Sequence, residues 1–195
     1  MPHAILPRLL FATGIITATA VGAARPACAG AAFPVTSPII YQSGDSWSQQ
    51  GRRYRLYGVQ ACIRGTSFVA SSGEKGDCGA ASVAMLAGLF KNLRVNCTPI
   101  APGQDNATIV ICAGASHDRP LDIGAAMISA GFAFSAEKPG GAPVSLAYFA
   151  SEIRAHAGRA GLCGAASFTH PVQMLRGLAS QPKPQPWRRA GALRL

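Results

Sequence analysis

Residues 44–47 read Gly-Asp-Ser-Trp and residues 53–62 read Arg-Tyr-Arg-Leu-Tyr-Gly-Val-Gln-Ala-Cys, within a region of short apolar segments. Between residues 37 and 59 these segments are separated by Gly44 and Gly51, and glycine at such positions is typical of tight turns between strands. The pattern predicts two or three short strands at the start of the folded part of the chain.

Helical and strand patterns alternate downstream of this region. Apolar residues recur at helical spacing from Ala80 to Leu89 and are followed by a helix stop at Lys91-Asn92, which predicts a helix near 79–91. We expect further elements as follows: strands at 93–100 and 108–113 joined as a hairpin by the turn 101–106, and helices at 122–129 and 143–159. Strands followed by helices predict an α+β, mainly β fold, a small barrel with helical cover.

The N-terminal residues 1–29 have the composition of a secretory signal peptide. Arg8 is followed by an apolar stretch, and the small residues around Cys28 form a cleavage site before Gly30. We therefore expect a secreted or periplasmic protein whose residues 30–35 form a linker. An uncleaved anchor is the alternative, but the stretch is short of the roughly 20 strongly apolar residues that span a bilayer. No other segment is apolar enough, so we expect no stable membrane span after cleavage.

The chain is basic, with a formal net charge of +10, and losing Arg8 and Arg25 with the signal lowers this by two, to +8. A basic surface favours polyanions, which include nucleic acid, anionic polysaccharide and phospholipid headgroups, and charge alone does not choose among them. Residues 177–195 combine prolines with four basic residues, which predicts a disordered tail that is either solubilising or an electrostatic tether. The sequence predicts no oligomeric state.

Export makes disulfides the expected state of the cysteines. After loss of Cys28 an odd number of cysteines remains, which suggests two bridges and one spare thiol. The remaining cysteines are Cys62, Cys78, Cys97, Cys112 and Cys163. If the segments that end at Cys97 and Cys112 pair as neighbouring strands, these two cysteines can form one bridge, and Cys62 with Cys78 is the natural second. The sequence does not settle the pairing. A zinc site is a poor alternative because no Cys-x-x-Cys occurs and the histidines are scattered.

Residues 36–176 resemble the staphylococcal nuclease (thermonuclease) family in the opening run and in the order and spacing of several short segments. These segments are Asp77-Cys78-Gly79 with Ala81, Leu121-Asp122 through Gly131-Phe132-Ala133, and Gly161-Leu162-Cys163 with Phe168, Pro171 and Arg176. The resemblance implies an OB-fold, a five-stranded barrel with three helices, as a single domain. In its last segment Cys163 replaces an aromatic residue, which makes this cysteine the candidate for the free thiol.

In that family calcium is held by two aspartates and a threonine carbonyl, a glutamate helps to deliver water, and two arginines neutralise the phosphate. Matched residue by residue, Asp45 corresponds to the first aspartate and Arg55 to the first arginine. The remaining positions are degenerate: Gln60 replaces the second aspartate, Ala61 the threonine, Cys62 a proline, Ile63 the glutamate, and Ala107 the second arginine if the hairpin is aligned on Cys112. Both retained residues also have a purely structural interpretation. Asp45 is of a residue type that is typical of turns, and Arg55 either pairs with Asp45 inside the protein or faces the solvent.

These replacements predict a pseudo-nuclease. Exchanging a carboxylate for the amide of Gln60 weakens calcium binding, and Ile63 cannot accept a proton. We therefore expect no resident cofactor, and calcium only if the protein is active. The alternative is a weakly active calcium-dependent nuclease that hydrolyses DNA or RNA, in which Glu74 or Asp77 replaces the missing base.

Without catalysis, the expected function is that of a binding or accessory protein for a polyanion. OB-folds bind oligonucleotides and oligosaccharides, and some exported relatives are named for a role in succinoglycan exopolysaccharide production. Nucleic acid and acidic polysaccharide are therefore both candidate partners. Base stacking requires exposed aromatic residues, and Trp47, Tyr54 and Tyr57 lie in the right region, although aromatics on strands more often belong to the core.

Overall fold

The computed structural model describes residues 30–116 and 119–180, which form an α+β structure dominated by strands. The α+β, mainly β class predicted from the sequence is confirmed. The largest sheet in these residues has seven strands: β1 (Phe33–Pro34), β2 (Ile39–Ser43), β3 (Ser46–Gln49), β4 (Arg52–Leu56), β8 (Arg94–Pro102), β9 (Ala107–Ser116) and β10 (Arg119–Asp122). The predicted signal segment 1–29 lies outside the described residues.

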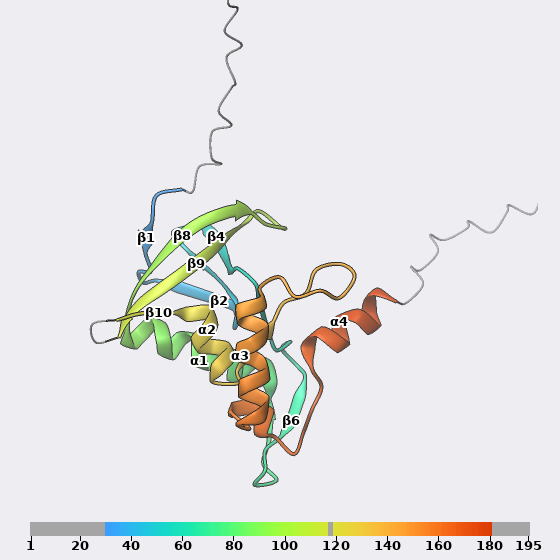
Figure 1. The fold of residues 1–195 in the computed structure, drawn as a ribbon. Helices are drawn as coiled ribbons and strands as arrows, with labels where there is room; N and C mark the ends of the chain where they lie inside the picture. Colours follow the sequence, from blue (N-terminus) through green and yellow to red (C-terminus); the bar gives the residue numbers. More distant parts are fainter. Residues whose placement is uncertain (1–29, 117–118, 181–195) are drawn as a thin grey trace, which may run out of the picture.

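The strand order explains why this sheet curls into a half-barrel. β2, β3 and β4 form an antiparallel meander, β4 pairs in parallel with β9, and β9 continues through β8 to β1. β1 and β2 therefore lie at opposite ends of the order, yet only the four residues 35–38 separate them along the chain. So short a connection can join the two ends only if the sheet bends round, as Figure 1 shows.

Two smaller sheets and four α-helices complete the described structure. The smaller sheets pair β5 (Val59–Ala61) with β11 (Ala133–Ser135), and β6 (Ser67–Val69) with β7 (Lys75–Asp77) and β12 (Ser167–Phe168). The helices are α1 (Cys78–Asn92), α2 (Ile123–Ser129), α3 (Leu146–Ala157) and α4 (Pro171–Ala179), with a 3₁₀ turn η1 (Gly161–Gly164) between α3 and β12. α1 and α2 lie along one side of the curled sheet (Figure 1).

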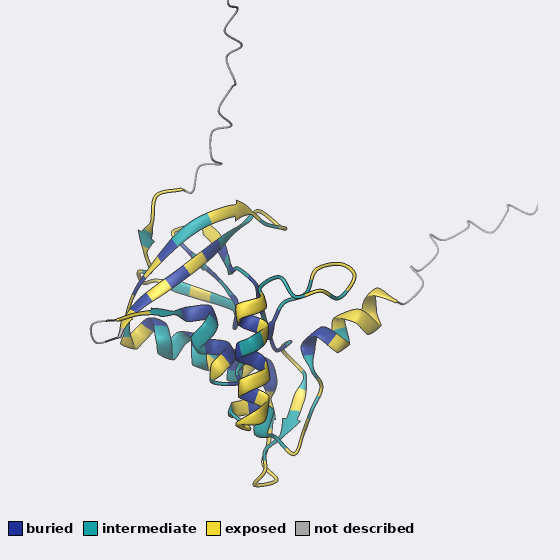
Figure 2. Ribbon diagram, in the orientation of Figure 1, coloured by how far each residue is buried: buried dark blue, intermediate teal, exposed yellow. Residues whose placement is uncertain are grey.

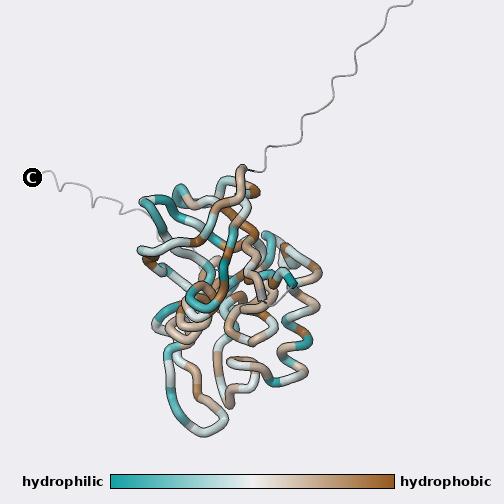
Figure 3. The backbone as a smooth tube through the Cα atoms, turned by 90° about the vertical axis from the view of Figure 1, so that its left-hand side faces the viewer, coloured by the Kyte–Doolittle hydropathy of each residue, from teal (hydrophilic) through white to brown (hydrophobic). Residues whose placement is uncertain are grey.

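The main core lies between the curled sheet and the helices, as the buried segments in Figure 2 show. Trp47 is fully buried and its ring meets that of Phe90 from α1 edge-on, with centroids 4.9 Å apart. Gly44, at the β2–β3 turn, allows this approach because a Cβ there would overlap Ser82 of α1. A smaller core cluster contains Cys62, Cys78, Phe134 and Leu162. Hydrophilic and hydrophobic residues alternate along the tube in Figure 3, as expected for elements with one buried face.

Most elements predicted from periodicity are confirmed. The hairpin is formed by β8 and β9, and α1, α2 and α3 occupy the three predicted helical segments. α3 is shorter than predicted because the Ser145 hydroxyl accepts a hydrogen bond from the Tyr148 N–H at 3.3 Å and so caps the helix there. Residues 143 and 144 instead bond to the segment after β11, where the Val144 N–H donates to the Ala136 carbonyl at 2.8 Å.

The described residues differ from the expected five strands and three helices. Part of the predicted linker is β1, which pairs with β8 because Phe33 is apolar and packs on Tyr54, with ring centroids 4.6 Å apart. β10 adds a seventh strand beside β9. The fourth helix, α4, begins with Pro171 at its first position and buries Val172, and it continues through residues 177–179 of the predicted tail. The rest of that tail, 181–195, lies outside the described residues.

The structure contains the two disulfides that the sequence favoured. Cys62, just after β5, is bonded to Cys78 at the start of α1. Cys97 and Cys112 lie directly opposite each other on β8 and β9 and form the second bridge. Cys163 is the free cysteine of the described residues. Two disulfides fit an oxidising compartment.

Among the helices of the described residues, none has both the length and the apolar character needed to cross a bilayer.

Asp77 provides a test of the helix boundary. Its carboxylate accepts hydrogen bonds from the N–H groups of Ala80 at 3.0 Å and Gly65 at 2.9 Å, and these bonds lower the pKa of Asp77. We expect Asp77→Ala to lower the free energy of unfolding by about 1 kcal/mol. Because the folded-state pKa is lowered, the contribution is present above the ordinary carboxyl pKa and is lost as the pH falls through the folded value.

The measurement is urea unfolding at pH 7 and at pH 3, with Glu74→Ala as the control. Glu74 is an exposed acid in the neighbouring turn. A loss in Asp77→Ala that is the same at both pH values would contradict the capping role of the ionised carboxylate.

Candidate functional site

Asp45 lies in the turn between β2 and β3 and is almost completely buried, with 2% of its surface exposed. Its backbone carbonyl accepts the N–H of Leu56 at 2.8 Å, which attaches the turn to the end of β4. A buried carboxylate is costly unless donors satisfy it. The surroundings of Asp45 therefore decide what this site can do.

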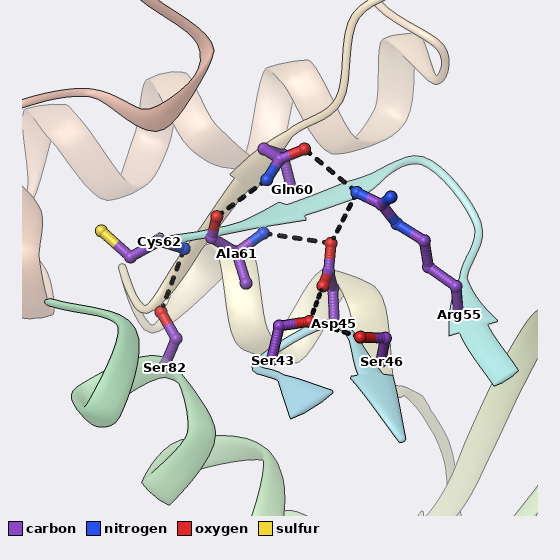
Figure 4. Close-up of polar contacts among 8 residues, drawn as sticks. All are labelled: Ser43, Asp45, Ser46, Arg55, Gln60, Ala61, Cys62 and Ser82. Atoms are coloured by element: carbon purple, nitrogen blue, oxygen red, sulfur yellow. Dashed lines mark hydrogen bonds and ion pairs between the residues drawn. The ribbon is translucent and has the colours of Figure 1, made fainter. Parts of the chain in front are cut away.

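Three donors from three parts of the chain converge on the Asp45 carboxylate (Figure 4). Arg55 Nη2, from β4, lies 3.0 Å from Oδ2 and forms an ion pair with it. The Ala61 N–H, from β5, donates to the same oxygen at 3.4 Å. The Ser43 hydroxyl, at the end of β2, donates to Oδ1. The carboxylate is thus held by the protein itself.

Gln60 extends this network. The same Arg55 nitrogen that contacts Asp45 donates to Gln60 Oε1 at 3.1 Å, and Gln60 Nε2 donates to the Ala61 carbonyl at 2.9 Å. The resemblance assigns Asp45, Gln60 and the residue-61 carbonyl to calcium. All three groups accept a hydrogen bond from the protein. The guanidinium of Arg55 also neutralises the charge of the Asp45 carboxylate.

This donor set does not fit a calcium ion. Calcium requires six to eight oxygen ligands and depends strongly on anionic ones. The site supplies one carboxylate, and that carboxylate is paired with a cation at 3.0 Å. An ion here would have to displace Arg55 and compete with the Ala61 N–H and the Ser43 hydroxyl.

The other predicted positions separate into two groups. Ala107 lies on β9 opposite Arg53 of β4 and lines the same cavity as Arg55. Ile63 does not line that cavity; its backbone lies against Gly79 at the start of α1. Asp77 is engaged as the cap of α1, and Glu74 lies in the exposed turn between β6 and β7. Neither acid lines the cavity beside Arg55.

The cavity beside Arg55 has a volume of about 460 Å³. β4 and the β4–β5 turn form one wall, and the turn between β8 and β9 and the segment after β11 form the others. Its polar residues are Ser46, Arg53, Arg55, Tyr57, Gln104, Asp105 and Glu137. Arg53 donates to the Asp105 carbonyl at 3.2 Å, which ties the β8–β9 turn to β4.

The three candidate stacking aromatics do not form a platform. Trp47 and Tyr54 belong to the core, with 0% and 7% of their surface exposed. Tyr57 is partly exposed and lines the cavity, and its hydroxyl donates to the Val144 carbonyl at 3.4 Å. One of the three aromatics therefore remains accessible to a ligand.

The structure also brings together three residues that the sequence analysis did not connect. Glu152 and His156 of α3 meet His170, the residue before α4. The prediction that the histidines are scattered is therefore wrong for His156 and His170. Glu152 and His156 are four residues apart on a helix, a spacing that places them on one face and was visible in the sequence. No local pattern points to His170, because the approach of α4 to α3 is a tertiary contact.

Burial alone raises the pKa of Glu152, but hydrogen bonds from His170 and from the Ser135 N–H lower it below its ordinary value. Burial, followed by the nearby charge of Glu152, raises the pKa of the Cys163 thiol. The free cysteine is therefore a poor thiolate at neutral pH.

Comparison with known proteins adds no family assignment: a scan against protein-family models and a search of curated proteins both find no match.

The ion pair between Arg55 and Asp45 leads to a stability prediction. Arg55→Ala removes the cation from a carboxylate whose side chain is 3% exposed, and we expect a loss of about 2 kcal/mol in the free energy of unfolding. Arg53→Ala is the matched control, because this neighbouring arginine makes an exposed contact to a backbone carbonyl and should change stability by less than about 0.5 kcal/mol. Denaturant unfolding of both variants is the measurement, and equal losses would refute the role of the pair.

Proposed function

We propose that this chain is an exported, non-catalytic binding protein of OB-fold type, and that its ligand is a polyanion. The order β2-β3-β4-β9-β8, with β4 and β9 parallel, supports a five-stranded Greek-key barrel to which β1 and β10 are added. The signal-like N-terminus and the two disulfides support export to the periplasm or the medium.

The single observation that carries the loss of catalysis is the closed network around Asp45. Arg55 donates hydrogen bonds to both Asp45 and Gln60. The arginine that the resemblance assigns to the phosphate is therefore engaged in contacts within the protein. A general base commonly contributes about 10²–10⁴ in rate and a positioned charge-stabilising group roughly 10²–10³. These contributions do not multiply simply, but losing both leaves at most a trace of hydrolysis.

The cavity beside Arg55 supports binding of an anion. Arg53 and Arg55 both contribute guanidinium groups to its wall, but Arg55 is paired with Asp45, so Arg53 is the group offered to a ligand, and the small Ala107 lies opposite it. Of the two acids on the wall, Glu137 is paired with Arg176, and the backbone carbonyl of Asp105 accepts a hydrogen bond from Arg53. The formal charge of the exported chain, +8 after loss of two arginines from +10, adds a long-range attraction for a polymer with many negative charges.

An acidic polysaccharide fits this surface better than a nucleic acid. Proteins that bind single-stranded nucleic acid normally combine a basic groove with several stacking aromatics. Here Trp47 is fully buried, and Tyr54 and Tyr57 both line the cavity, but Tyr54 is only 7% exposed, so Tyr57 is the one partly exposed ring of the three. The charges of the ligand, rather than stacked bases, would then supply most of the affinity.

The first test of this proposal is hydrolysis. The oxidised chain without residues 1–29 should not cleave single-stranded DNA in the presence of calcium, because the site lacks a second carboxylate and a base. Asp45→Asn, which keeps the size of the side chain, is measured beside it, with and without a chelator. Calcium-dependent cleavage that Asp45→Asn abolishes would overturn the pseudo-nuclease proposal in favour of a weakly active nuclease.

The second test is binding to an immobilised acidic polysaccharide and to single-stranded DNA over a range of salt concentrations. Arg53→Ala should weaken binding and reduce the slope of log affinity against log salt by about 1, the loss expected for one anion contact. Lys91→Ala, at the end of α1, removes the same charge outside the cavity and should leave the slope unchanged.

Because Arg53→Ala is also expected to leave stability unchanged, a loss of binding in this variant cannot be attributed to unfolding. Tighter binding to DNA than to polysaccharide at equal salt would identify nucleic acid as the ligand. Equal effects of the two substitutions would show that the cavity is not the binding site.

A further inference from the structure

A second cavity, of about 300 Å³, lies between α3 and α4 and is lined by Glu152, His156 and His170. Glu152 and His156 project from α3, and His170 is the residue that precedes α4. One ligand atom from each of the three side chains lies within 4.8 Å of those from the other two. The cluster is separate from the Asp45 network and plays no part in the proposed function.

The three side chains converge on a single carboxylate oxygen. His170 Nε2 lies 2.9 Å from Glu152 Oε1, and His156 Nε2 lies 3.9 Å from the same atom. The first distance is a hydrogen bond, but the second is too long for one. The spacing of four residues on α3 places the His156 nitrogen near this oxygen without a hydrogen bond to it.

Surrounding contacts hold the three groups in place. The Ser135 N–H donates to Glu152 Oε2 at 2.6 Å, which orients the carboxylate and leaves Oε1 directed at the histidines. The His170 ring packs edge-on against Phe134, with centroids 4.5 Å apart. The Glu152 and His170 side chains are 11% and 19% exposed, whereas that of His156 is 43% exposed. The site is thus buried at Glu152 and His170 and open to solvent at His156.

We propose that Glu152, His156 and His170 bind one divalent transition-metal ion, with zinc as the preferred metal. Two imidazoles and one carboxylate form an established donor set for zinc, whereas calcium and magnesium prefer oxygen ligands only. The ion would replace the proton that joins His170 to Glu152 Oε1, and the fourth position would open into the cavity.

The observed distances suit such an ion after small side-chain movements. Ligands at about 2.0–2.2 Å from a tetrahedral zinc ion lie roughly 3.3 Å from one another. The two nitrogens, at 2.9 Å and 3.9 Å from the carboxylate oxygen, lie on either side of that separation. The Glu152 carboxylate already has the hydrogen-bonded outer partner that metal ligands normally require, in the Ser135 N–H.

The cavity also contains a matched control. Glu137 lines it and is paired with Arg176, whose Nε lies 2.9 Å from Glu137 Oε2, so this carboxylate compensates the only guanidinium of the cavity wall. Glu137 is not one of the three grouped ligands. Its replacement therefore removes a carboxylate from the same cavity without removing a proposed ligand.

The experiment is titration of the oxidised full chain, produced without a histidine tag, with zinc by calorimetry and with cobalt(II) by visible spectroscopy. We expect one ion per chain, the visible bands of four-coordinate cobalt(II), no thiolate charge-transfer band, and a higher Tm with zinc. His156→Ala and His170→Ala should each lower the affinity by more than the roughly 10–100-fold that loss of an outer hydrogen bond costs.

Cys163→Ser should bind zinc as the unsubstituted chain does, and Glu137→Gln, which also breaks the ion pair with Arg176, should still bind one ion per chain. His156 is the decisive position, because it is half-exposed and its substitution should leave the fold intact, which unfolding in the absence of metal verifies. The proposal is overturned if the unsubstituted chain binds no zinc at micromolar concentration, if His156→Ala binds it equally well, or if a thiolate band appears and is lost in Cys163→Ser.

Discussion

The buried carboxylate of Asp45 is the constraint on which the N-terminal half of the structure depends. A charge with 2% exposure must be paired and hydrogen-bonded, and its donors come from the end of β2, from β4 and from β5. These segments can supply their donors only if the turn, the meander and β5 meet at one point. Gly44, the residue before Asp45, packs closely against Ser82, so the same turn also contacts α1.

The same network explains why the proposed function is binding rather than hydrolysis. In a metal-dependent active site, carboxylate oxygens must be available to an ion and an arginine must be available to the substrate. Here Arg55 lies between Asp45 and Gln60 and contacts both side chains. Closing the site in this way stabilises the fold and leaves the adjacent cavity, with Arg53 on its wall, as the surface that can receive an anionic group.

The C-terminal half is organised differently. α4 has few buried residues, and its attachment depends on Pro171 and Val172, on the ion pair of Arg176 with Glu137, and on the contact of His170 with Glu152. Polar contacts therefore help to attach α4, to α3 through His170 and Glu152 and to the segment after β11 through Arg176 and Glu137. An ion bound by Glu152 and both histidines would cross-link these two helices in a region where the hydrophobic contribution is small.

Local patterns in the sequence were sufficient for the α+β class, for the β8–β9 hairpin and for three helices, because alternation and helical periodicity report which face of each element is buried. The sequence also indicated both disulfides. Only the tertiary structure decided which donors satisfy Asp45, that Phe33 adds a strand beside β8, and that His170 reaches Glu152. Those contacts join residues far apart in the chain, and register and helix packing, which no local pattern encodes, determine them.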